Sequence, residues 1–255
     1  MFFCIFDTQN RRMNLVVDIG NTFVKLAVFQ NNKLLEVDSF EQNLFEKKIS
    51  NFFESYPKIS HSILSSVQKH PLSWENLLQQ KSNFIKLTST TPVFFSNQYA
   101  TPNTLGIDRI ALMASAAYNY PNKNVLVIDA GTCITYDFLN KKKEYLGGAI
   151  SPGLKMRARA MHEFTGKLPL VGIDATTVNK LIGQNTQQCM QIGVLKATSL
   201  EIDGFIEEYK DIFEDLTIIL TGGDSQLLSK NVKNSIFASS NFLIEGLNQI
   251  LEFNK

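Results

Sequence analysis

The chain has 255 residues, of which 44% are hydrophobic and 19% are charged, and its formal net charge at pH 7 is +1. This content is enough to bury one large or two small cores, and the near-zero charge gives no bias toward nucleic acid or an anionic membrane surface. No apolar run approaches the roughly 18 residues that cross a bilayer, and the opening residues lack the basic segment and the length of a signal peptide. We therefore expect a cytoplasmic globular protein.

The first half of the chain reads as strands followed by helices. Residues 1–12 precede a second candidate start at Met13, and we interpret them as a loose arm or a wrongly assigned start. Apolar patterns predict strands over 15–19, 23–29, 34–40, 59–67 and 84–87, and helices over 42–56 and 107–118.

The second half opens on a similar strand hairpin. Strands are predicted over 126–130, 134–139 and 216–220, and helices over 155–164, from 186 toward 206, and over 241–253. Strand hairpins followed by helices, given twice, predict an α/β architecture of two related sheets with packed helices. Neither the three cysteines nor the three histidines show the spacing of a metal site: Cys4, Cys133, Cys189, His61, His70 and His162.

An Asp-x-Gly turn occurs twice, each time at the end of an apolar strand. One copy begins at Asp18 and continues through Gly20, and the other begins at Asp129 and continues through Gly131. The glycine allows a sharp turn whose N–H groups can point at an anion, and the carboxylate suits a metal-bound polyphosphate. For either copy alone, an ordinary hairpin turn is the alternative. The matching positions favour two similar half-molecules, each with a phosphate loop.

Asp108 and Arg109 lie in the first turn of the helix predicted over 107–118. The helix dipole there favours an ionised carboxylate, and the neighbouring guanidinium is a fork donor for an anionic oxygen. In phosphoryl transfer to a hydroxyl group, such a carboxylate can accept the hydroxyl proton. The alternative interpretation is a helix-end carboxylate beside a surface charge.

The glycine turns at three strand ends resemble the two phosphate loops and the adenosine loop of the acetate and sugar kinase and actin superfamily. An ordered set of motifs then resembles type III pantothenate kinase over nearly the whole chain from Met13. The motifs are Asp18-Ile19-Gly20-Asn21-Thr22, Tyr99-x-x-Pro102-x-x-Leu105-Gly106-x-Asp108-Arg109, Asp129-x-Gly131-Thr132-x-x-Thr135-x-Asp137, Gly147-Gly148-x-Ile150-x-Pro152-Gly153, Gly183-x-Asn185-Thr186 and Thr221-Gly222-Gly223.

This resemblance implies two ribonuclease H-like (actin-like ATPase) domains, over 13–112 and 113–255, with a nucleotide cleft between them. It implies a catalytic base at Asp108 and a site for a monovalent cation, K⁺ or NH₄⁺, at Asp129. The remaining implied contacts are with ATP and Mg²⁺ for Asp18, Ile19, Gly20, Asn21, Thr22, Phe23, Val24, Lys25 and Thr132, and with pantothenate for Tyr99, Gly106, Ile107, Asp108, Arg109 and Thr186.

We therefore expect ATP-dependent phosphorylation of the primary hydroxyl of pantothenate, the first step toward coenzyme A. The resemblance also implies a homodimer in which Thr186 reaches the neighbouring subunit's pocket. Two alternatives remain: a non-catalytic nucleotide-binding regulator on the same fold, and a kinase for another small hydroxy acid. The joint presence of Asp108, Arg109, Asp129 and Thr132 argues against the regulator.

Overall fold

The computed structural model describes residues 12–173 and 180–255. The expectation for an N-terminal arm, apart from Arg12, therefore lies outside the described residues, as does Cys4. The chain forms two compact units. The first contains the described residues up to Phe94 together with Thr101–Ser115 and Leu243–Lys255, and the second contains Phe95–Ala100 and Ala116–Phe242.

The first unit is built on a five-stranded mixed sheet of order β3-β2-β1-β4-β5. β1, β2 and β3 form an antiparallel meander, and β4 and β5 continue the sheet parallel to β1. The β2–β3 turn has Asn31 and Asn32 at φ of 51° and 61°, the left-handed conformation that two-residue hairpin turns require and that Asn tolerates. The strands are β1 (Met13–Ile19), β2 (Val24–Gln30), β3 (Lys33–Phe40), β4 (Ile59–Ser66) and β5 (Asn83–Lys86).

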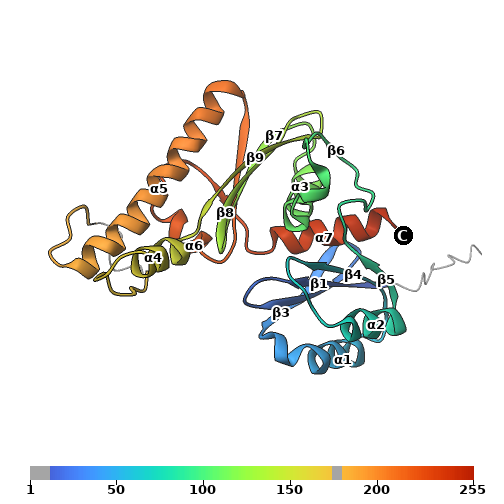
Figure 1. Cartoon of the computed structure of the whole chain (residues 1–255). Coiled ribbons are helices and arrows are strands. Elements are labelled where there is room, and N and C mark those ends of the chain that lie inside the picture. The colour runs from blue at the N-terminus through green and yellow to red at the C-terminus, as the bar shows by residue number, and fades with distance from the viewer. Residues whose placement is uncertain (1–11, 174–179) are drawn as a thin grey trace, which may run out of the picture. The chain divides into compact units, whose positions relative to one another are not determined.

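Helices cover both faces of this sheet (Figure 1). On one face, α1 (Phe45–Ser55) and α2 (Leu72–Lys81) supply aromatic and aliphatic side chains to a core with β1 and β2. Phe45 and Trp74 stack there with ring centroids 3.9 Å apart. The other face is contacted by α7 (Phe242–Phe253), where Asn14 of β1 donates to Asn248 at 2.7 Å.

The C-terminal helix groups with the first unit, whereas the expected division of the chain at residue 112 assigns it to the second domain. The reason is close packing of α7 on α3 (Ile107–Asn119): a Cβ at Gly246 would lie 1.8 Å from the carbonyl oxygen of Ala111. Only glycine permits that approach.

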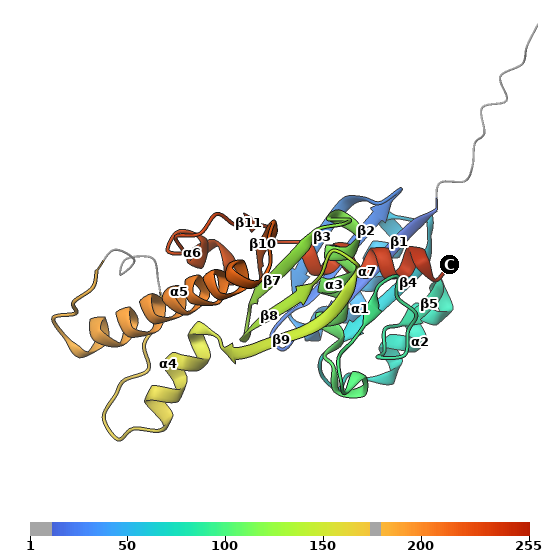
Figure 2. The same ribbon diagram turned by 90° about the horizontal axis from the view of Figure 1, so that it is seen from above.

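The second unit has a six-stranded mixed sheet of order β11-β10-β7-β8-β9-β6. Figure 2 shows α4 (Leu154–Glu163) beside the long helix α5 (Thr186–Ile212), and apolar residues of both join the core formed with β7 and β8. The strands are β6 (Ser96–Asn97), β7 (Asn124–Ala130), β8 (Cys133–Leu139), β9 (Glu144–Pro152), β10 (Leu216–Thr221) and β11 (Phe237–Ala238), and the short helix α6 (Ser225–Ser229) also belongs to this unit. The first unit contains the two short helices η1 (Gln42–Leu44) and η2 (Pro102–Thr104). The expected α/β class with two mixed sheets and packed helices is confirmed.

Candidate active site

The first predicted phosphate loop connects β1 to β2 in the first unit. The Gly20 N–H donates to the carbonyl oxygen of Phe23 at 3.0 Å, which closes a tight turn. A Cβ at Gly20 would lie 3.2 Å from that oxygen, so the turn favours glycine. Asn21, Thr22 and Phe23 are exposed, whereas Ile19 and Val24 on either side are buried. The sheet therefore anchors both ends of a loop whose backbone is accessible to a ligand.

Asp18 lies at the end of β1, opposite Lys25 of β2. Burial raises the pKa of the Asp18 carboxyl to about 6; Lys25 opposes that rise and the Asp108 carboxylate adds to it. Asp18 and Asp108 therefore lie close enough to repel each other. Because burial and a like charge both disfavour the carboxylate, a bound cation would stabilise it there.

Asp108 occupies the first turn of α3, as predicted. Its Oδ1 accepts a hydrogen bond from the Arg109 backbone N–H at 2.9 Å. A Cβ at Gly106 would lie 2.4 Å from this oxygen, so glycine at that position leaves the carboxylate room. Arg109 is buried, with 5% of its surface exposed, which rules out the alternative that it is a surface charge. One carboxylate oxygen is thus fixed by the helix.

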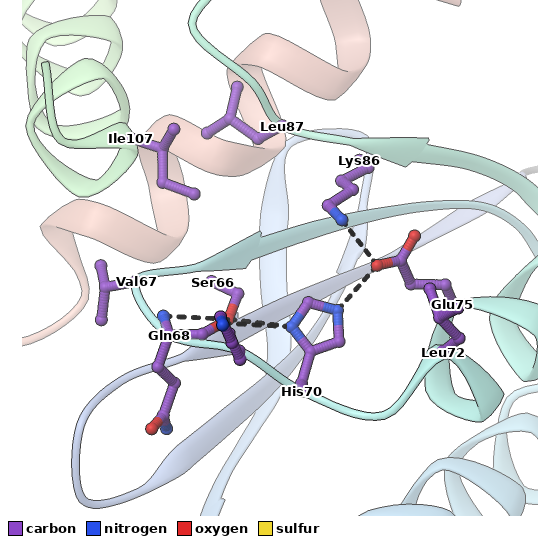
Figure 3. A pocket seen from close by; sticks show the side chains of 10 residues that line it. Ser66, Val67, Gln68, His70, Leu72, Glu75, Lys86, Leu87 and Ile107 are labelled. Atoms are coloured by element: carbon purple, nitrogen blue, oxygen red, sulfur yellow. Dashed lines mark hydrogen bonds and ion pairs between the residues drawn. The ribbon is translucent and has the colours of Figure 1, made fainter. Parts of the chain in front are cut away.

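A cavity of about 650 Å³ in the first unit lies beside these groups, and Ile107 is among its lining residues (Figure 3). Hydrogen-bonded side chains line this cavity. His70 Nδ1 lies 3.1 Å from Ser66 Oγ, and His70 Nε2 lies 2.8 Å from Glu75 Oε1. Lys86 Nζ contacts the same Glu75 oxygen at 2.7 Å. Burial raises the pKa of Glu75, but hydrogen bonds from Lys86 and His70 outweigh it, and the net shift is downward.

Gln68 connects this cavity to the first loop. Its side-chain Nε2 donates to the carbonyl oxygen of Gly20 at 2.7 Å, and its backbone carbonyl oxygen accepts from Ser66 Oγ at 2.7 Å. Both polar groups of the Gly20 backbone are therefore held by hydrogen bonds. Its N–H donates to Phe23 within the loop, and its carbonyl oxygen accepts from Gln68. Sequence analysis missed Gln68, although the polar run over 68–70, shortly after the buried strand β4, was a usable signal.

The second predicted phosphate loop connects β7 to β8 in the second unit. Its Gly131 N–H donates to the carbonyl oxygen of Cys133 at 2.9 Å, which repeats the closure of the first loop with one residue fewer. Asp129 is aligned with Thr135 of β8 and with Thr221 of β10. Thr132, at the turn, is exposed. The repeated hairpin of the sequence is therefore a structural repeat, but the two loops differ in length.

Glycines from two other segments pack on this second loop. The Gly153 N–H donates to the Thr132 carbonyl at 3.1 Å, and a Cβ at Gly153 would lie 2.2 Å from the Gly131 oxygen. Gly222 has φ of +93°, and a Cβ there would lie 2.4 Å from Asp129 Oδ1. The glycine-rich motifs thus converge on one end of the sheet, where Gly153 makes room for the second loop and Gly222 makes room for the Asp129 carboxylate.

Tyr99 and Thr186 lie on separate elements of the second unit. Tyr99 follows β6, is half-buried, and stacks on the ring of Tyr145. Thr186 is the exposed first residue of α5, and Asn185 caps that helix by accepting from the Gln188 N–H at 2.9 Å. The first unit therefore holds Asp18–Lys25 and Gly106–Arg109, and the second unit holds Tyr99, Asp129, Thr132 and Thr186.

Between residues 12 and 173 and between 180 and 255, no group of three His, Cys, Asp or Glu side chains is placed to hold a metal ion. Among the same residues, none of the helices combines the length and the apolar content needed to span a membrane.

Comparisons with known proteins point to one family. Residues 14–208 match the family model described as type III pantothenate kinase. A type III pantothenate kinase of Christiangramia forsetii is 54% identical over 243 residues, which cover 95% of this chain and 99% of that protein. One from Flavobacterium johnsoniae is 46% identical, with coverage of 94% and 98%.

Solved structures support the fold. A protein of Campylobacter jejuni, described as a conserved putative Baf family transcriptional activator, aligns with a TM-score of 0.60 at 24% identity, covering 94% of this chain and 98% of that one. A glucokinase from an Antarctic psychrotroph aligns with a TM-score of 0.53 at 12% identity, with coverage of 94% and 99%. From the family model and the near full-length relatives, the chain belongs to the type III pantothenate kinases.

Proposed function

We propose that the chain transfers the γ-phosphoryl group of ATP to the primary hydroxyl of pantothenate and so forms 4'-phosphopantothenate. Family membership supports the substrates. The single structural observation that carries the chemistry is the proximity of the Asp18 and Asp108 carboxylates within the first unit, where the Asp108 charge adds to the raised pKa of Asp18. Asp18 suits the metal-bound phosphates, and Asp108 suits the hydroxyl nucleophile.

In the first unit, the loop over Asp18–Lys25 contacts the phosphates of ATP. In the second unit, Thr132 is an ATP contact. Mg²⁺ in such sites is held by one or two carboxylates together with substrate phosphates, which agrees with a lone Asp18 rather than a complete protein cage. The raised pKa of Asp18 supports the assignment, because a cation would relieve both the burial and the repulsion from Asp108. When bound, the metal neutralises charge on the phosphates.

Asp108 accepts the proton of the pantothenate hydroxyl. Its Oδ1 is held by the Arg109 N–H, so we assign proton acceptance to Oδ2. Fixing one oxygen orients the other without removing its basicity, which is what a general base requires. Gly106 and Ile107, which precede Asp108 in the chain, contact pantothenate together with Arg109. The buried Arg109 guanidinium binds an anionic group of pantothenate.

Tyr99 and Thr186 of the second unit are pantothenate contacts, and Thr186 acts from the partner subunit of a homodimer. Two observations support an interface near Thr186. The residue is exposed at the start of α5, and Leu181 and Ile182 just before it expose 76% and 79% of their surfaces. Large apolar side chains so exposed favour burial against another protein surface.

Asp129 holds a monovalent cation, K⁺ or NH₄⁺. Supporting this, a Cβ at Gly222 would lie 2.4 Å from Asp129 Oδ1, so glycine at this position keeps a side chain from crowding the carboxylate. K⁺ in place of Na⁺ should then raise turnover with pantothenate.

An ATP-consumption assay over a panel of small hydroxy acids tests the proposed function. Pantothenate should give turnover that depends on Mg²⁺ and on K⁺ or NH₄⁺. Turnover with a different hydroxy acid alone would favour the kinase of other specificity, and nucleotide binding without transfer to any acceptor would favour the regulator. Sedimentation at assay concentration tests the dimer, which an active monomer would contradict.

A further inference from the structure

The ring of Tyr99 rests on a buried polar and aromatic platform within the second unit. It stacks on Tyr145, with centroids 6.1 Å apart and planes 9° from parallel. Tyr145 is fully buried, and its hydroxyl donates to Asp137 Oδ1 at 2.7 Å. Asp137 is also fully buried. Burying a carboxylate is costly unless hydrogen bonds stabilise it. The Tyr145 hydroxyl supplies such a bond to Asp137, and this bond fixes the direction of the hydroxyl.

The backbone around Tyr99 is tied to the same strand. Asn97 of β6 is paired with Tyr145 of β9, and the Gln98 N–H donates to the Tyr145 carbonyl at 2.9 Å. The Tyr99 N–H in turn donates to the Asn97 side chain at 3.0 Å. Tyr145 therefore contacts the Tyr99 segment through both its main chain and its ring.

The Gly147-Gly148 motif makes this arrangement possible. Gly147 has φ of +105°, a conformation that favours glycine, and a Cβ there would lie 3.4 Å from the Tyr99 ring. A Cβ at Gly148 would lie 1.5 Å from the carbonyl oxygen of Tyr136, so β9 can lie against β8 only with glycine at this position. Neither glycine has a role in the proposed phosphate or acceptor contacts. Gly147 makes room for the Tyr99 ring, and Gly148 lets β9 pair with β8 beside Asp137.

We propose that Asp137 and Tyr145 are positioning residues for the acceptor: they hold the Tyr99 ring where pantothenate contacts it. The inference rests on the proposed function of Tyr99 as a pantothenate contact. Neither residue touches the substrate in this account. Asp137 orients Tyr145, and Tyr145 supports Tyr99 from beneath.

The test compares two tyrosine-to-phenylalanine variants of the full-length protein. Tyr145→Phe removes the hydroxyl that Asp137 holds. Tyr136→Phe is a matched control, because Tyr136 is also fully buried, in the neighbouring strand β8, and its hydroxyl also donates to a carboxylate, that of Glu201 at 3.0 Å. Its ring stacks on Phe205 of α5, away from Tyr99.

Both variants should be less stable to heat, since each loses one buried hydrogen bond. Only Tyr145→Phe should raise the KM for pantothenate, by about threefold to tenfold, the equivalent of one such bond. The KM for ATP should stay within twofold of the wild-type value in both. In a Tyr99→Ala background, Tyr145→Phe should add nothing further to the pantothenate KM, because its effect passes through the Tyr99 ring.

An unchanged pantothenate KM in Tyr145→Phe, an equal rise in Tyr136→Phe, or additive effects in the double variant would each overturn the proposal. These outcomes differ from a failure of the proposed function, in which the wild-type protein itself would not phosphorylate pantothenate.

Discussion

Replacing Asp18 by Asn should stabilise the ligand-free protein while it weakens binding of MgATP. Burial raises the pKa of this carboxyl from 3.8 to about 6, so folding takes up a proton between those two pH values. A carboxyl whose pKa is higher in the folded state adds stability below its unfolded pKa and loses it as the pH rises through the folded pKa. Above pH 6 the native protein therefore carries a desolvated charge that Asn removes.

The size of the effect follows from the shift. Each pKa unit corresponds to about 1.4 kcal/mol, so a rise of about two units gives a difference of about 3 kcal/mol between the two protonation states. We expect Asp18→Asn to unfold at a Tm higher by roughly 5 °C or more at pH 8. The gain should shrink as the pH falls from 6 to 4, where the wild-type carboxyl is protonated.

Thermal unfolding of both proteins without ligands, at several pH values between 4 and 8, measures this difference. Asp108→Asn provides a control, since removing the like charge should lower the pKa of Asp18 and move the pH dependence downward. If Asp18→Asn were no more stable than the wild type at pH 8, or if its advantage did not change with pH, the account of a buried, repelled carboxylate would be refuted.

Three further substitutions test other parts of the site. Asp108→Asn keeps the helix-end acceptor for the Arg109 N–H but removes the proposed general base. Turnover should therefore fall by about 10²- to 10⁴-fold, with a stability loss of only about 0.3–1 kcal/mol. Near-normal turnover would contradict the assignment of Asp108 as the base. Gln68→Ala removes the donor to the first loop and should raise the KM for ATP by about threefold to tenfold, whereas equal changes for both substrates would contradict the role. Gly222→Ala, at φ of +93° and against a carboxylate, should lower both stability and K⁺ activation, while Gly223→Ala, with open space around its Cβ position, should change neither; identical behaviour of the two would contradict the cation site.

Much of the fold was predictable because its strands carry strong local signals. Residues 15–19 and 126–130 are apolar runs closed by Asp-x-Gly, and the structure places them in β1 and β7 with antiparallel partners. The predicted helix over 107–118 matches α3, with Asp108 in its first turn. At these positions local pattern and tertiary burial agree, which makes sequence reasoning reliable.

Other parts depend on contacts between distant segments. α2 was not predicted, because only Trp74 and Leu78 of this helix are buried and its apolar periodicity is weak. The return of Leu243–Lys255 to the first unit depends on the fit of Gly246 to α3. Likewise, the bond from Gln68 to Gly20 joins two loops whose closeness follows from the parallel pairing of β1 and β4. Such pairings are set by topology rather than by local residue choice.

The most direct test of the central claim is identification of the product. The full-length protein with ATP, Mg²⁺, K⁺ and pantothenate should consume ATP and form one phosphate monoester, which phosphorus and proton nuclear magnetic resonance should place on the primary hydroxyl carbon of pantothenate. Asp108→Asn under the same conditions should form it at least about 100-fold more slowly. Absence of this ester from the wild-type reaction, or its formation at an undiminished rate by Asp108→Asn, would contradict the account.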